Sequence, residues 1–173
     1  MDKPLTSEFV NLVERINRTV GDVTAWLALL MVLTQFTVVI LRYVFSTGSI
    51  QLQESIWYMH GTFFMLGVGY TLLKDQHVRL DIFYRSANEN RKALINLLGS
   101  LFLLIPFCIF IGWLSWPFIA TSWAVHETSM EVSGLPILFL FKTIILIFCF
   151  LLVVQGLALS IKNLHQLRNI TAR

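Results

Sequence analysis

Four long apolar runs divide this chain of 173 residues and limit what it can fold into. They cover residues 23–45, 52–73, 93–123 and 135–161. Each run is long enough to cross the hydrocarbon core of a bilayer, about 30 Å thick, as a helix that rises about 1.5 Å per residue. Isolated strands are excluded, because lipid offers no partner for the open edge of a sheet. The runs therefore predict an all-α integral membrane protein with four transmembrane helices.

The composition excludes an ordinary soluble domain. The chain is 56% hydrophobic and 13% charged, whereas a soluble domain carries about 25% charged residues. A chain of this length also lacks the volume to bury four such runs in one core. The sequence contains no internal repeat or Gly/Ser linker, so we expect a single membrane domain over residues 1–173. The first run is too long for a cleavable signal peptide and is expected to remain in the protein.

The positive charges predict the orientation of the chain. Of the thirteen Lys and Arg residues, eleven lie in the N-terminal arm, in the connection after the second run, or in the C-terminal tail. The connections 46–51 and 124–134 contain none. Because Lys and Arg concentrate on the cytoplasmic side of a membrane, both termini are predicted to be cytoplasmic.

Residues 5–20 differ from the four runs because they are amphipathic. One face of a helix over this segment carries the apolar side chains Leu5, Phe9, Leu12, Ile16 and Val20. Polar and charged side chains occupy most of the rest of its surface. This pattern predicts a separate N-terminal helix that lies along the cytoplasmic surface of the membrane.

The third run is several turns longer than one membrane crossing requires. A helix of this length is expected to tilt, to bend near Pro106 or Pro117, or to project beyond the outer surface. Small residues on the second run, Gly67 and Gly69 with Thr71, offer places where another helix can approach closely.

Four ionisable residues lie within or at the edge of the apolar runs, where burial of charge is costly and often functional. Arg42 and Glu54 flank the first short connection, so they form an ion pair or share a contact with a partner, unless Arg42 only extends to the interface. Lys142 lies two turns into the last run and is expected to pair with Glu54, with Glu131 or with a carbonyl of another subunit. His60 is predicted to be a packed, hydrogen-bonded histidine.

The sequence contains no pattern that indicates catalysis. We find no nucleophile motif, metal-ligand spacing or phosphate-binding loop, and we expect no cofactor and no nucleic acid. Cys108 and Cys149 lie in apolar runs and are interpreted as small apolar filler. The runs also lack the polar midplane and broken helices of a carrier. The chain is therefore predicted to assist another protein.

Several motifs resemble those of a known family. They are RYVF at 42–45, QES at 53–55, GVGYTLLKDQHVRLDIFY at 67–84, and ETSMEVSGLP at 127–136 with Lys142 downstream. In this order they resemble the small Q-type, DctQ-like membrane subunit of tripartite ATP-independent periplasmic (TRAP) transporters. Two rival hypotheses are a membrane anchor of a quinone-linked or haem redox complex and a disulfide-generating membrane enzyme. Haem is disfavoured by the lack of a second histidine at the depth of His60.

The resemblance implies a three-part importer in a bacterial inner membrane. A periplasmic binding protein captures a small organic anion, and a large M-type subunit moves it by an elevator motion coupled to sodium. The small subunit scaffolds the large one and itself binds no substrate. The motifs are most similar to those of systems that import monocarboxylates, 2-oxo acids or aromatic acids.

The resemblance also suggests roles for four charged residues. Arg79 and Asp81 either fix a turn or contact the large subunit, with Asp81 as a candidate N-cap, or they belong to a solvated loop. Glu127 and Glu131 either contact the binding protein or are ordinary solvated acids.

Overall fold

A computed structural model describes residues 3–76 and 87–171 of the chain, with side chains described for 6–76 and 87–168. All the regular structure in these residues is helical. The elements are α1 Lys3–Tyr43, α2 Ile50–Leu73, α4 Glu89–Leu98, the π-helix η1 Gly99–Leu104, α5 Ile105–Ala124 and α6 Leu138–Thr171. The predicted all-α class is confirmed.

Three helical stretches are long and apolar enough to cross a membrane. They are Thr6–Tyr43, Glu89–Ala124 and Leu138–Arg168. The remaining helix, α2, has 24 residues but is less apolar, since it contains Gln51, Gln53, Glu54 and His60. The fourth crossing therefore stays a prediction.

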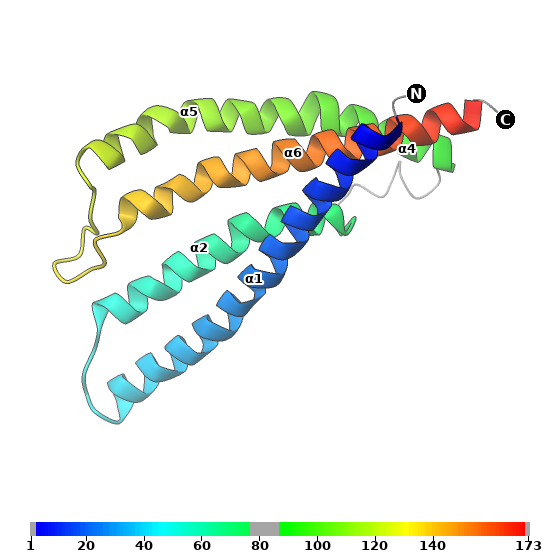
Figure 1. The fold of residues 1–173 in the computed structure, drawn as a ribbon. Helices are drawn as coiled ribbons and strands as arrows, with labels where there is room; N and C mark the ends of the chain where they lie inside the picture. Colours follow the sequence, from blue (N-terminus) through cyan, green and yellow to red (C-terminus); the bar gives the residue numbers. More distant parts are fainter. Residues whose placement is uncertain (1–2, 77–86, 172–173) are drawn as a thin grey trace.

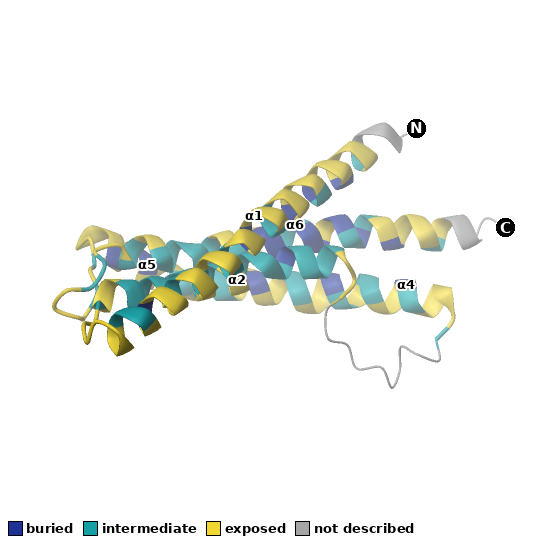
Figure 2. Cartoon of the chain, turned by 90° about the horizontal axis from the view of Figure 1, so that it is seen from below, coloured by how far each residue is buried: buried dark blue, intermediate teal, exposed yellow. Residues whose placement is uncertain are grey.

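The helices form an open layer. Figure 1 shows them side by side in the order α1, α2, α6, α5, and each neighbouring pair is in contact. Figure 2 shows the layer nearly from its edge, with the first turns of α1 leaving it on one side. Only ten hydrophobic residues of the described chain are buried. The chain therefore does not form a compact four-helix bundle. Its broad apolar faces must be covered by lipid or by protein.

Residues 5–20 are the first half of α1 and do not form a separate helix, so that part of the sequence prediction is wrong. The helix continues through Gly21, where a Cβ would lie 2.5 Å from the ring of Tyr70. The hydroxyl of Thr24 donates to the Val20 carbonyl at 2.8 Å, a bond within the helix that leaves it unbroken.

The first half of α1 packs on α6 with a face that is adjacent to the predicted apolar one, about a quarter of a turn around the helix. Val10 and Val13 are buried in a cluster with Ala158 of α6. Phe9, Leu12 and Ile16 of the predicted apolar face are exposed. The amphipathic segment therefore has two apolar sides, one for α6 and one that remains uncovered in this chain.

The long third run is one helical stretch, Glu89–Ala124, with a π-helical segment inside it. The amide of Ile105 donates to the Ser100 carbonyl, five residues back. The next residue is Pro106, which has no amide hydrogen to continue the α-helical pattern. The long third run is thus one continuous helical stretch, and its helix type changes locally next to Pro106, one of the two prolines at which a bend was predicted.

The last helix begins and ends later than predicted. Leu135 and Pro136 lie in the turn before α6, which then continues ten residues past the predicted end at residue 161. Polar contacts hold this extension, and the prediction from apolar residues alone could not include them. Asn163 is buried, and Lys162 forms an ion pair with Glu14 of α1.

Buried polar groups join α6 to its neighbours at two places. The side-chain amide of Asn17 donates to Gln155 Oε1 at 3.0 Å, and Gly69 of α2 lies directly against Asn17. Ser100 and Ser160 are joined by a hydrogen bond of 2.8 Å between η1 and α6. Interhelical hydrogen bonds and small residues of this kind hold membrane helices together.

The Asn17 crossing yields a paired prediction. Gly69→Ala would push a methyl group into Asn17, which is 1% exposed, and we expect it to destabilise the chain by about 1–3 kcal/mol. Gly67→Ala, two residues away on α2, meets nothing within 4 Å and should leave stability unchanged or slightly raised. Thermal unfolding in detergent measures both. Equal melting temperatures would show that the crossing does not limit stability.

Candidate functional site

The connection between α5 and α6, residues 125–137, folds into a compact turn beside the start of α2. We call it the α5–α6 loop. The amide of Ser129 donates to the Leu135 carbonyl at 3.3 Å, and the amide of Gly134 donates to the Glu131 carbonyl at 3.0 Å. The amide of Glu131 donates to Ser129 Oγ at 3.1 Å. These bonds close the loop on itself between residues 129 and 135.

Glu54 of α2 holds this loop in place. Its Oε2 accepts the Leu135 amide at 2.6 Å, and its Oε1 accepts the hydroxyl of Tyr58 at 3.0 Å. A Cβ on Gly134 would lie 2.6 Å from Glu54 Oε2 and would overlap Ser129, so only glycine fits there. The QES and SGLP motifs, 80 residues apart in the sequence, thus form one contact between α2 and the loop.

Aromatic packing continues the contact of α2 with α6 below Glu54. The ring of Tyr58 stacks on Phe141 with 4.8 Å between centroids and 28° between planes. A Cβ on Gly61 would lie 2.5 Å from Phe141 Cζ, so the small residue allows the ring to approach α2. The carboxylate and the ring pair together fix α2 against the first turns of α6.

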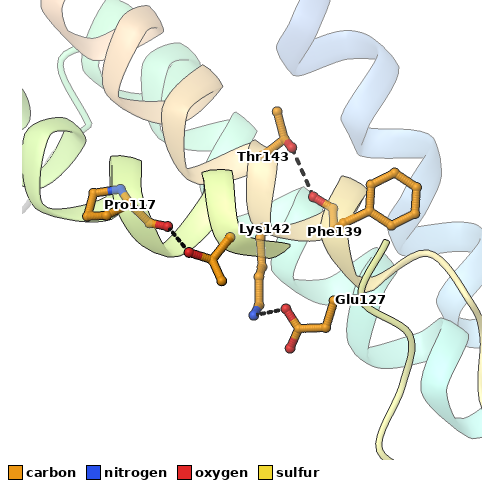
Figure 3. A network of polar contacts seen from close by, with 6 residues as sticks. Pro117, Glu127, Phe139, Lys142 and Thr143 are labelled. Atoms are coloured by element: carbon orange, nitrogen blue, oxygen red, sulfur yellow. Dashed lines mark hydrogen bonds and ion pairs between the residues drawn. The ribbon is translucent and has the colours of Figure 1, made fainter. Parts of the chain in front are cut away.

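Lys142 of α6 lies at the centre of a second polar contact (Figure 3). Its ammonium donates to Glu127 Oε2 in the α5–α6 loop and lies 3.9 Å from the centroid of the Phe118 ring on α5. The Lys142 side chain is only 13% exposed. The ammonium thus joins α5, α6 and the loop, because a largely desolvated cation gains from both an anion and an aromatic face.

The ammonium of Lys142 changes the pKa of the Glu127 carboxyl. The hydrogen bond from Lys142 is the main cause that lowers the pKa of Glu127, followed by the hydroxyl of Ser122. The sequence predicts Glu54, Glu131 or a carbonyl of another subunit as the partner of Lys142. The structure places Glu54 on Leu135 and leaves Glu131 exposed, so the loop carboxylate that reaches Lys142 is Glu127.

Two predicted contacts are not found among the described residues. Arg42 is exposed at the end of α1 and forms no ion pair there with Glu54. His60 is exposed on α2 and has no hydrogen-bond partner in the described parts of the chain, so this chain by itself does not provide the packing predicted for it. Arg79 and Asp81 lie outside the described residues.

The exposed tip of the α5–α6 loop is partly apolar. Met130 and Val132 are almost fully exposed, at 96% and 102%, on either side of Glu131. The bonds at Glu54 and Lys142 fix the base of this loop and leave its tip free for contact. The described contacts thus hold the α5–α6 loop so that its tip is presented on the surface.

In residues 3–76 and 87–171, no three His, Cys, Asp or Glu side chains are grouped to hold a metal ion.

Comparison with known protein families identified the family of this chain. A family model for tripartite ATP-independent periplasmic transporters, DctQ component, matches residues 31–166, which include Glu54, Lys142 and the whole α5–α6 loop. No curated protein and no solved structure matched the chain. The matching family is a transporter component family, so the redox-anchor hypothesis gains no support.

The role of Glu54 can be tested by amide hydrogen exchange. In Glu54→Ala, the Leu135 amide loses a charged acceptor, and we expect exchange in residues 129–135 to become about ten- to a hundredfold faster. Glu131→Ala, which removes an exposed acid from the same loop, should leave Leu135 protected. Unchanged exchange at Leu135 in Glu54→Ala would show that the loop holds its shape alone.

The ion pair between Lys142 and Glu127 predicts a pH dependence. Because the pKa of Glu127 is lowered below its ordinary value of 4.5, the pair stabilises the fold above that pH, and its contribution is lost as pH falls through the lowered pKa. Glu127→Gln should therefore unfold at lower temperature than wild type at neutral pH, and the difference should shrink below pH 4.5. A difference that is constant with pH would exclude the pair as its source. Glu131→Gln is the matched control.

Proposed function

The chain belongs to the DctQ component family of tripartite ATP-independent periplasmic transporters, and we propose that it braces the large permease subunit of such a transporter during transport. Its apolar helices and its family make it a protein of the inner membrane. The observation that carries the proposal is the open layer of helices. A layer with two broad apolar faces and few buried residues is suited to lie along another membrane protein.

We propose four crossings with both termini in the cytoplasm. The helix α2 lies between α1 and α6, antiparallel to α1 and parallel to α6 (Figure 1), and 24 residues span about 36 Å at 1.5 Å per residue. The start of α1 and the end of α6 lie at one end of the layer, and the α5–α6 loop lies at the other (Figure 1). The loop end contains no Lys or Arg in residues 46–51 or 124–134, which supports a periplasmic location.

This topology assigns partners to the two ends of the layer. The fixed α5–α6 loop, with Met130, Glu131 and Val132 at its tip, offers a contact for the periplasmic binding protein. Arg79 and Asp81 are proposed to contact the large subunit on the cytoplasmic side. The large subunit carries the sodium-coupled movement of a small organic anion, such as a monocarboxylate, a 2-oxo acid or an aromatic acid.

Cysteine labelling tests the topology. Ser133→Cys, in the exposed part of the α5–α6 loop, should react with an impermeant thiol reagent added to the periplasm, whereas Asn90→Cys on α4 should react only after the inner membrane is permeabilised. The wild-type chain is the control, since Cys108 and Cys149 are both buried. Labelling of Asn90→Cys alone in intact spheroplasts would reverse the orientation.

Affinity purification tests the function. We expect the tagged chain, produced together with the large permease subunit of its transporter, to retain that subunit in mild detergent at one to one stoichiometry. The control is an unrelated tagged membrane protein of similar size in the same preparation. Recovery of the chain without the large subunit, under conditions in which both are folded, would contradict the proposal.

A further inference from the structure

One face of α2 carries a stripe with the spacing of a helix-pairing surface. Residues 53, 60, 67 and 74 are seven apart, and 57, 64 and 71 fall between them at the three- and four-residue steps of a heptad. We call this stripe the α2 seam. Its members are Gln53, Trp57, His60, Phe64, Gly67, Thr71 and Lys74. Residues spaced in this way lie on one side of a helix and pack against a partner that crosses at about 20°.

The larger side chains of the α2 seam are uncovered in this chain, whereas Gln53 and Thr71 are half-buried. Trp57 is 76% exposed and Phe64 is 66% exposed, and His60 is also exposed. A Cβ on Gly67 would meet nothing within 4 Å. Other positions on α2 make the contacts within the layer, as Gly61 does with Phe141 and Gly69 with Asn17. The seam therefore faces away from the neighbours of α2.

We infer that a membrane helix of the large permease subunit packs along the α2 seam. This inference rests on the proposed function and names the surface that carries it. The position of His60 indicates that protein, and not lipid, covers the α2 seam. It lies about 15 Å along α2 from Ile50, at 1.5 Å per residue, which is close to the middle of a membrane crossing. Acyl chains offer an imidazole no hydrogen bond, whereas a partner helix can supply one.

The edge of the layer formed by η1 and α5 (Figure 1) offers a surface of the same chain for comparison. The outward side chains of η1 and the first part of α5 are exposed and wholly apolar. They include Leu101, Phe102, Phe107, Ile109 and Phe110. The α2 seam differs from them in having an imidazole and, at its end, an ammonium. Of the long helices in the described residues, α2 is also the one that is not among the three apolar enough to span a membrane.

A second copy of this chain fits the seam poorly. Two copies in one membrane share an orientation, so a two-fold axis along α2 would oppose each seam residue to itself. Lys74 would then face Lys74, which would place two ammonium groups next to each other. A different chain can place a large side chain at Gly67, a hydrogen-bonding group at His60 and an acceptor at Lys74. The seam therefore favours a heterologous partner.

Two matched glycine variants test this inference. Gly67→Leu fills the space on the seam, and Gly99→Leu adds the same side chain to η1, where a Cβ also meets nothing within 4 Å. The tagged chain is produced with the large subunit, and the amount of that subunit retained is measured. We expect Gly67→Leu to retain at least tenfold less than wild type and Gly99→Leu to retain the wild-type amount.

Equal retention by the two glycine variants would overturn the inference and leave the proposed function intact. Failure of the wild-type chain to retain the large subunit would instead overturn both. Leucine favours a helix more than glycine does, so α2 itself should not be weakened. The melting temperature of the isolated variant checks this point.

Photo-crosslinking gives a second measurement on a chain with an unaltered glycine pattern. Benzoylphenylalanine replaces Phe64 on the seam or Phe102 on η1, two phenylalanines that are 66% and 67% exposed. We expect the first to crosslink to the large subunit and the second to react with lipid alone. A crosslink from position 64 to a second copy of the chain, or to lipid only, would overturn the inference even if Gly67→Leu failed to fold.

Discussion

Membrane helices have no hydrophobic reason to leave lipid for one another, and the whole arrangement of this chain depends on how its helices overcome that constraint. They do so with small residues and hydrogen bonds at a few points. Near the middle of α1, Asn17 bonds to Gln155 while Gly69 allows α2 to approach. At the loop end, Glu54 connects α2 to the turn before α6. Between these points the helices bury little, so the layer stays open.

An open layer suits the proposed role of a small protein that braces a larger one. Its helices are joined at two positions along their length. One is the contact of Asn17 in α1, and the other is the contact of Glu54 at the loop end. Two such contacts fix the direction of the joined helices relative to one another. A surface with fixed direction and little burial of its own gains most by packing on a partner. A brace of this form differs from a carrier, whose polar groups must converge on a site within the membrane.

The sequence predicted the helical class and the location of most elements, because apolar length and the distribution of charge act locally along the chain. It did not predict that α1 continues through Gly21, since the reason is the close approach of Tyr70 from another helix. The same limit applies to Lys142. Its depth predicted a partner, but only the folded loop shows that Glu127 is closer than Glu54 or Glu131. The exposure of His60 was also missed, because periodicity alone does not show which side of α2 faces the layer.

The most direct test of the brace is transport itself in liposomes. The large permease subunit is reconstituted with and without this chain, and uptake of the anion that its binding protein retains is measured under an inward sodium gradient. We predict that liposomes with both subunits accumulate the anion, that the large subunit alone is severely impaired, and that this chain alone moves nothing. Full uptake by the large subunit alone, or any uptake by this chain alone, would contradict the account.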